Sequence, residues 1–274
     1  MAALSTHNMD FIYPAGNGPV FEQLSLQLPF NAVTAVLGPN GSGKTTLLEL
    51  FLGLLTPTTG TVAIHGKGRT TYASKDLKRI IGLVPQNESI PFDLSLLEYV
   101  LLGRAPFLGL LQTPGPRDRS AALAAIDQVG LARLQHRPVP QMSGGERQLA
   151  SVARALAQES QILLMDEPTS HLDLANARRI LNLMQQIKHH GRTVLFTTHD
   201  PNAAAAVADH VVLLKQGCLL AAGGVAETLT TELLSATYDQ PIEVVRTHLG
   251  PLVSAYTDSP SAVTGPAQPQ MRRN

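Results

Sequence analysis

The sequence predicts an α/β fold with a core of buried, parallel strands, preceded by shorter antiparallel strands and interrupted by a helical insertion. Short apolar runs of the kind that form buried strands lie at residues 32–37, 79–84, 161–165 and 193–197. Residues 9–37 contain further strand-like runs separated by a turn rich in Gly and Pro. Residues 94–141 instead alternate between helical patterns and Gly/Pro breakers, which indicates a helical insertion between two strands of the core.

The 274 residues suffice for one large domain, which we place at residues 1–250 with a helical subdomain inserted at about 88–160. Residues 251–274 are rich in Pro, Ser, Ala and Gln without periodicity, so we expect a flexible tail there. The single cysteine, Cys218, excludes an intramolecular disulfide and lies in an apolar stretch, where we expect a small core residue.

Charge and hydropathy narrow the class of protein. Lys and Arg number 21, and so do Asp and Glu, so the net charge gives no sign of a nucleic-acid partner. No apolar run is long enough to span a bilayer, and the N-terminus lacks the basic and apolar regions of a signal peptide. We therefore expect a cytosolic chain, or one that another protein holds at a membrane.

A glycine-rich loop follows the first buried run and precedes a segment without helix breakers. Its residues are Gly38, Pro39, Asn40, Gly41, Ser42, Gly43, Lys44 and Thr45. The pattern G-x-x-x-x-G-K-[ST] between a strand and a helix is typical of a loop whose backbone amides bind phosphate. Lys44 would reach the β- and γ-phosphates of a nucleotide, and the Thr45 hydroxyl would bind Mg²⁺. The alternative is a glycine-rich turn that binds nothing.

Polar residues follow three of the other predicted strands. Asp166 and Glu167 come directly after residues 161–165. Carboxylates at the carboxyl end of a parallel strand lie at the mouth of the site in open α/β sheets, so Asp166 would help to hold Mg²⁺ and Glu167 would accept a proton from the attacking water. Gln86 could touch Mg²⁺ or its water, and His199 could contact the γ-phosphate. Each could also be a solvated polar residue that merely ends a strand.

Two further features fit a nucleotide site. Tyr13 precedes the strand that leads to the glycine loop and could stack on adenine, although taken alone it is more simply an ordinary strand aromatic. Ser143 and Glu146 have the spacing of a helix capping box. A capped helix start alone does not explain Gly144 and Gly145, since glycine weakens a helix; a second phosphate-binding helix terminus would explain them.

These motifs together resemble the nucleotide-binding subunits of ABC transporters, whose cassette has a phosphate-loop, RecA-like core. The matching segments are GPNGSGKTT at 38–46 (Walker A, which includes Thr46), Gln86 (Q-loop), MSGGE at 142–146 (signature), ILLMDEP at 162–168 (Walker B), SHLD at 170–173 (D-loop, which includes Asp173) and THD at 198–200 (switch histidine). Met142, Glu146 and His171 depart from the commonest forms of the signature and the D-loop. The serine and both glycines that would contact phosphate are retained.

The resemblance implies an ATPase with ATP and Mg²⁺ as cofactors that works as a head-to-tail homodimer, in which Ser143, Gly144 and Gly145 of one copy face the nucleotide of the other. It also implies separate membrane permease subunits, an extracytoplasmic substrate-binding protein, a peripheral position on the cytoplasmic face of the membrane, and no nucleic acid. Residues 100–109, 168–176 and 234–244 are similar to importers of metals and metal chelates. The alternatives are an exporter, an importer of another substrate class, a soluble ABC ATPase acting on DNA or ribosomes, and a phosphate-loop kinase or GTPase.

Overall fold

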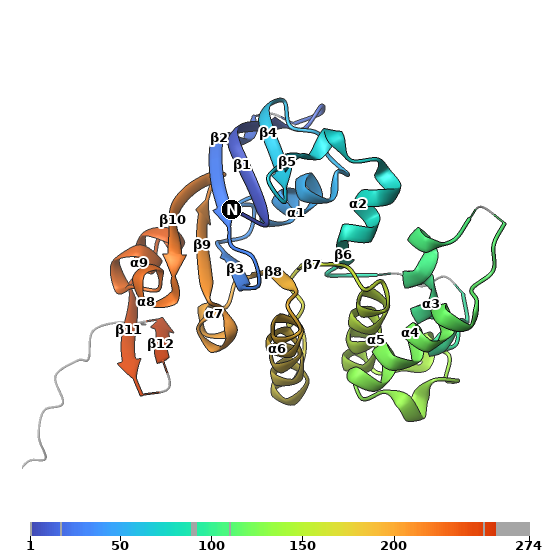
Figure 1. Ribbon diagram of the computed structural model, residues 1–274. Helices are drawn as coiled ribbons and strands as arrows, with labels where there is room; N and C mark the ends of the chain where they lie inside the picture. The colour runs from blue at the N-terminus through green and yellow to red at the C-terminus, as the bar shows by residue number, and fades with distance from the viewer. Residues whose placement is uncertain (1, 17, 89–91, 110, 249, 256–274) are drawn as a thin grey trace, which may run out of the picture.

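The computed structural model describes residues 2–16, 18–88, 92–109, 111–248 and 250–255. Its centre is a six-stranded sheet in the order β10-β9-β3-β8-β7-β6 (Figure 1). The strands are β3 (Val33–Leu37), β6 (Ile81–Val84), β7 (Ile162–Met165), β8 (Thr193–Thr198), β9 (His210–Lys215) and β10 (Cys218–Gly224). All neighbouring strands from β9 to β6 run parallel, and only β10 pairs antiparallel, with β9. The predicted α/β class is therefore confirmed.

The central sheet is buried on both faces, which explains why its strands are continuous apolar runs rather than alternating ones. Alternate residues of β3 belong to different hydrophobic clusters: Ala35 packs with the long helices on one side, and Val36 packs with the first helix and the N-terminal strands on the other. In Figure 1 α5 (Gly144–Ala157), α6 (Leu174–His189) and α7 (Pro201–Val207) cover the first face, whereas α1 (Lys44–Leu52) lies on the second.

The N-terminal strands form the predicted antiparallel subdomain over α1. The strands are β1 (Leu4–Ile12), β2 (Pro19–Leu28), β4 (Thr59–Ile64) and β5 (Lys67–Gly68), in the order β2-β1-β4-β5. Leu24, Leu26 and Leu28 alternate with exposed residues and are buried. This alternation is the pattern expected of a sheet with one buried face, and it fixes which face of β2 meets α1.

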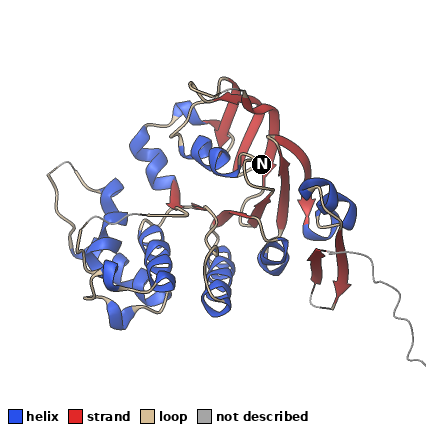
Figure 2. Ribbon diagram, turned by 180° about the vertical axis from the view of Figure 1, so that it is seen from behind, coloured by secondary structure: helices blue, strands red, loops and turns tan. Residues whose placement is uncertain are grey.

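Helices fill the segment between β6 and β7, as expected for an inserted helical subdomain. They are α3 (Leu96–Leu101), α4 (Pro116–Gln128) and α5, with short 3₁₀ turns between them. Figures 1 and 2 show these helices gathered at one end of the molecule, away from the antiparallel strands. Across the described residues, no helix combines the length and the apolar character needed to cross a bilayer.

Three expectations about the chain were wrong. The strand expected at residues 79–84 begins only at Ile81, because α2 (Ser74–Ile80) occupies the first positions. Cys218 is exposed, since it opens β10 beside the turn of the β9–β10 hairpin. The flexible tail does not begin at residue 251, because β12 (Gly250–Ala255) pairs with β11 (Ile242–Thr247). The remainder of the expected tail, residues 256–274, lies outside the described residues.

The C-terminal strands pair because short apolar stretches on each can face one another. Val244 lies opposite Val253, and Val245 lies opposite Leu252. The hairpin follows α8 (Val225–Thr228) and α9 (Thr231–Tyr238) and lies beside α7 in Figure 1. Four apolar residues divided between two strands give little periodicity, which explains why composition alone suggested a tail.

Candidate active site

A cleft of about 910 Å³ opens where β3, β7 and β8 end. Most residues expected to bind nucleotide line it: Tyr13, Pro39, Asn40, Gly41, Gly43, Lys44, Thr45, Thr46, Gln86, Glu167 and His199. Val20, His171 and Tyr238 line it too and were not expected. Its volume lies within the range of small-molecule sites, and its position at the carboxyl ends of parallel strands is where α/β sheets bind ligands.

The glycine loop of residues 38–45 needs glycine for two reasons. Gly41 and Gly43 have positive φ angles of 80° and 98°, which residues with a side chain rarely adopt. A Cβ on Gly43 would also lie 2.7 Å from the ring of Phe21 on β2. The loop therefore packs tightly under the antiparallel subdomain while its other side faces the cleft.

The N-terminus of α1 is available to an anion. Its N-cap, Gly43, supplies no side-chain hydrogen bond to the first turn, whereas α3, α5, α6, α7 and α9 each have an N-cap side chain that does. The Ser42 hydroxyl nearby is buried and has no hydrogen-bond partner among the described residues. Uncapped amides and the positive end of a helix are a suitable site for phosphate, so the residues present fit the triphosphate of a nucleotide.

Lys44 reaches from the start of α1 into the cleft and is only 7% exposed. Its ammonium donates to the carbonyl oxygens of Gly38 at 2.9 Å and Pro39 at 3.1 Å, and lies 3.9 Å from Glu167 Oε1. Burial lowers the pKa of Lys44, while the nearby carboxylates of Glu167 and Asp166 oppose that shift. A buried cation with carbonyl partners is poised to exchange them for the stronger negative charge of a phosphate.

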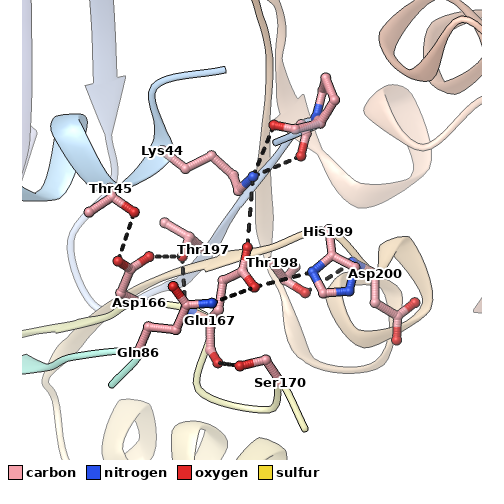
Figure 3. A network of polar contacts seen from close by, with 12 residues as sticks. Lys44, Thr45, Gln86, Asp166, Glu167, Ser170, Thr197, Thr198, His199 and Asp200 are labelled. Atoms are coloured by element: carbon pink, nitrogen blue, oxygen red, sulfur yellow. Dashed lines mark hydrogen bonds and ion pairs between the residues drawn. The ribbon is translucent and has the colours of Figure 1, made fainter. Parts of the chain in front are cut away.

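Asp166 is held by two hydroxyl groups at the end of β7 (Figure 3). Thr45 Oγ1 donates to one carboxylate oxygen at 2.8 Å, and Thr197 Oγ1 donates to the other at 2.6 Å. The Thr197 hydroxyl also accepts from the backbone N–H of Glu167 at 2.9 Å. Thr197 was not expected from the sequence; its signal would have been a hydroxyl side chain at the buried end of the next strand.

Glu167 lies at the centre of the polar network in Figure 3, with its side chain 13% exposed. Its Oε2 accepts from the Gln86 amide at 3.2 Å and lies 3.3 Å from His199 Nδ1. Its backbone has a φ of 42°, in the left-handed region that few residues other than glycine adopt. The hydroxyl and the backbone N–H of Ser170 both donate to its carbonyl oxygen. The chain thus turns sharply at Glu167 and aims its carboxylate at Lys44.

Tyr13 lines the cleft from the antiparallel subdomain, but its hydroxyl is anchored to the first helix. It lies 3.0 Å from the hydroxyl of Thr46 and donates to Glu49 at 3.3 Å. Its ring packs edge-on against Phe11 with the centroids 4.8 Å apart, and the residue is 37% exposed. The exposed part of the ring is available for stacking, which remains a prediction.

The signature residues, and Asp173 of the D-loop, lie outside the cleft of their own chain. Among the described residues that line the cleft, none of Ser143, Gly144, Gly145 and Asp173 is found. Ser143 caps α5 by the expected capping box, in which its hydroxyl accepts from the N–H of Glu146 at 3.3 Å. Asp173 caps α6 and accepts from the N–H and the side chain of Asn176.

We expected both glycines of α5 to be present because a phosphate approaches them. The structure shows different surroundings for the two. A Cβ on Gly144 would meet nothing within 4 Å, so its surface is open to a ligand. A Cβ on Gly145 would lie 2.5 Å from the side-chain nitrogen of Asn176 in the same chain. A side chain at position 145 would therefore have to displace the Asn176 side chain on α6, whatever Gly145 binds.

Comparisons with known proteins find relatives along most of the chain. The family model described as ABC transporter matches residues 21–170. The ferric enterobactin transport ATP-binding protein of Escherichia coli is 38% identical over 81% of this chain and 83% of its own length. The molybdate import ATP-binding protein of Haemophilus influenzae is 39% identical over 88% of this chain and 89% of its own length.

Solved structures have the same fold. One assigned to a metal-chelate type ABC transporter in an inward-facing conformation is 37% identical, with a TM-score of 0.80 over 92% of this chain and 96% of the other. A dimeric bacterial ABC transporter cassette is 29% identical, with a TM-score of 0.72 over 81% of this chain and 98% of the other. With the phosphate loop, the paired carboxylates and the capped signature helix in these places, the chain belongs to the ABC transporter family, as one of its ATP-binding, ATP-hydrolysing subunits.

Proposed function

We propose that this chain powers an importer of a metal or a metal chelate by binding and hydrolysing ATP in a homodimer. The observation that carries the proposal is the arrangement around Glu167, whose carboxylate lies between the Lys44 ammonium, the Gln86 amide and the His199 ring. A carboxylate next to a phosphate-binding lysine can take a proton from water that attacks the γ-phosphate.

Each residue of this arrangement has a proposed task. The amides of the glycine loop and Lys44 bind the β- and γ-phosphates, and Tyr13 stacks on the adenine. Glu167 accepts the proton of the attacking water, while Gln86 and His199 orient that carboxylate and the γ-phosphate. Hydrolysis then depends on positioning and on the neutralisation of charge rather than on a covalent intermediate with the protein.

The oxygen atoms near Thr45 fit Mg²⁺. The Thr45 hydroxyl, the Asp166 carboxylate and the amide oxygen of Gln86 are the hard ligands that Mg²⁺ prefers. Because Asp166 accepts hydrogen bonds from Thr45 and Thr197, it acts by orienting the Thr45 hydroxyl and adding negative charge close to the ion. When bound, Mg²⁺ neutralises charge on the β- and γ-phosphates.

Replacing Asp166 with asparagine should therefore weaken Mg²⁺ binding. We expect the Mg²⁺ concentration that gives half-maximal ATPase activity to rise by about 10- to 100-fold, as is usual when a group that orients a metal ligand is changed. The measurement is a Mg²⁺ titration at saturating ATP. The matched control is Asp209→Asn, whose carboxylate accepts from the N–H of Val33 and from Lys188. Equal Mg²⁺ requirements for Asp166→Asn and the control would contradict the assignment.

The proposed dimer is supported by the separation of the two helix starts that we expect to bind phosphate. Ser143 and Gly144 do not line the cleft of their own chain, yet the Gly144 surface is open. A second copy placed head to tail would bring its own Ser143 and Gly144 to this chain's nucleotide and close the site. The dimeric cassette of similar fold supports this assembly. Closure on ATP and opening after hydrolysis would then drive the permease.

The substrate class and the other partners rest on the relatives. Those of similar length are described as import or transport ATP-binding proteins for iron(3+)-hydroxamate, ferric enterobactin, hemin and molybdate. We therefore propose that this chain binds separate permease subunits at the cytoplasmic face of a membrane. An extracytoplasmic substrate-binding protein would deliver the substrate to the permease, and nucleic acid would not be a partner. We expect the permease, rather than this ATP-binding subunit, to decide which metal or chelate crosses the membrane.

Co-purification from the source cells tests the partner assignment. Tagged wild-type chain should retain an integral membrane protein, and vesicles containing that complex should take up a metal chelate only with ATP. Lys44→Ala in the same complex is the control, because it should keep the partner but lose uptake. Recovery of ribosomal RNA or DNA with the tagged chain, in place of a membrane protein, would overturn the proposal.

A further inference from the structure

The loop that carries His199 is attached to the C-terminal part of the chain, which the nucleotide motifs do not include. We use the term C-terminal module for the described residues from 231 to 255, which form α9, β11 and β12. The hydroxyl of Tyr238, at the end of α9, donates to the carbonyl oxygen of His199 at 3.2 Å. Tyr238 also lines the nucleotide cleft. One side chain of the module therefore reaches both the cleft and the backbone of His199.

A second attachment lies three residues further along the same loop. The Asn202 side chain, in the first turn of α7, donates to the carbonyl oxygen of Val253 at 2.9 Å and accepts from its N–H at 2.8 Å. The amide thus pairs with β12 as a neighbouring strand would. The two attachments come from different elements of the module, so they hold the segment from His199 to Asn202 at both of its ends.

The C-terminal module is itself bonded to the central sheet, so it can hold the His199 loop in a fixed position relative to that sheet. The Lys215 ammonium, at the end of β9, donates to the carbonyl oxygen of Ala236 at 2.7 Å and to the carboxylate of Asp239. Ser235 and Ile242 join α9 to β11 by two hydrogen bonds. Movement of the module relative to β9 would break these contacts. The module therefore fixes the position of the loop after β8 relative to the sheet.

The surroundings of Tyr238 keep its hydroxyl protonated. Burial raises the pKa of Tyr238 well above the usual range, and the carboxylates of Asp200 and Glu167 add to that shift, whereas the backbone of Gly38 opposes it. Its hydroxyl therefore stays a hydrogen-bond donor at neutral pH.

We propose that Tyr238 is a positioning residue, which holds the backbone of His199 so that the imidazole reaches Glu167 and the γ-phosphate, with the Asn202–Val253 pair as the second anchor. The proposal rests on the role of His199 given above. It also gives the C-terminal module a task in the ATPase reaction. The 3.3 Å contact between His199 Nδ1 and Glu167 is the geometry that the module would preserve.

The test is Tyr238→Phe, which removes the hydroxyl and keeps the ring. We expect kcat for ATP hydrolysis to fall by about 3- to 10-fold, the effect of one hydrogen bond on a rate, while KM and the dissociation constant for ATP stay within about twofold. Tyr72→Phe is the matched control, because the Tyr72 hydroxyl donates to the Ile64 carbonyl at 2.9 Å and neither is among the described residues that line the cleft. That variant should keep the wild-type kcat.

Hydrogen exchange gives a readout that does not depend on activity. In Tyr238→Phe, the backbone N–H groups of His199, Asp200 and Asn202 should exchange faster than in the wild type and in Tyr72→Phe; Pro201 between them has none. Asn202→Ala should show the same pattern and serves as the second variant if Tyr238→Phe does not fold. In a His199→Ala background, adding Tyr238→Phe should cause no further loss of rate, because both changes act through one group.

Three results would overturn the inference: a kcat for Tyr238→Phe equal to that of Tyr72→Phe, unchanged exchange at residues 199–202, or a loss confined to ATP affinity, which would make Tyr238 a nucleotide contact. A failure of the proposed role of His199 can be told apart from a failure of the proposal about Tyr238. If His199→Ala hydrolysed ATP at the wild-type rate, the role of His199 itself would be wrong, whatever Tyr238→Phe did.

Discussion

Replacing Glu167 with glutamine should lower kcat for ATP hydrolysis by at least about 100-fold while ATP still binds. Loss of a general base costs about 10²- to 10⁴-fold in rate. Glutamine keeps the size of the side chain and can still contact Gln86 and His199, both of which lie within 3.3 Å of the carboxylate. The change also removes a negative charge near the site of the γ-phosphate, so repulsion of ATP falls. We expect the variant to accumulate as an ATP-bound dimer.

Three measurements on the Glu167→Gln variant check this expectation: phosphate release, nucleotide content, and mass by light scattering with and without ATP. The matched control is Glu243→Gln on β11, a carboxylate outside the cleft lining, which should hydrolyse ATP normally and show no trapped dimer. Turnover of Glu167→Gln at the wild-type rate would mean that another group takes the proton.

Replacing Ser143 with arginine should prevent the dimer but not the binding of ATP. Ser143 does not line the cleft of its own chain, so the affinity of one chain for ATP should stay within about twofold. In the dimer, the larger side chain would occupy the space where the partner's γ-phosphate must lie. The ATPase rate should therefore fall by at least about 100-fold, since the loss of oriented phosphate contacts is of that order.

The helix cap complicates this variant and can be controlled. Losing the Ser143 cap on α5 costs about 1 kcal/mol of stability. Ser95 caps α3 by the same capping box, with Glu98 in place of Glu146, so Ser95→Arg imposes a similar cost away from the signature. On a sizing column, Ser95→Arg combined with Glu167→Gln should form the ATP dimer, and Ser143→Arg combined with Glu167→Gln should not. A normal dimer in the second case would disprove the role of Ser143.

The local sequence was sufficient to predict the phosphate loop and the polar residues at the strand ends. Gly41, Gly43 and Lys44 lie within four residues of one another, and the positive φ angles of the two glycines are ones that glycine readily adopts. Asp166 and Glu167 could be placed because they follow a short apolar run of the kind that is typical of a buried parallel strand. The capping box of Ser143 and Glu146 is likewise a short-range pattern, and the structure confirms it.

Contacts between distant segments could not be predicted in this way. Thr197 bridges Asp166 and Glu167 from a strand 30 residues later, and Tyr238 reaches His199 across 39 residues. Gly145 lies against the Asn176 side chain of the next helix, a contact that no single helix pattern records. The strand β12 was missed because its partner β11, rather than its own periodicity, makes it a strand.

The most direct measurement of the central claim is a structure of the Glu167→Gln variant with ATP and Mg²⁺. The account predicts two nucleotides between two copies. Each γ-phosphate would lie within hydrogen-bond distance of Lys44 of one copy and of the Ser143 hydroxyl of the other. Nucleotides bound by Lys44 of one copy with Ser143 of every other copy out of reach would contradict it.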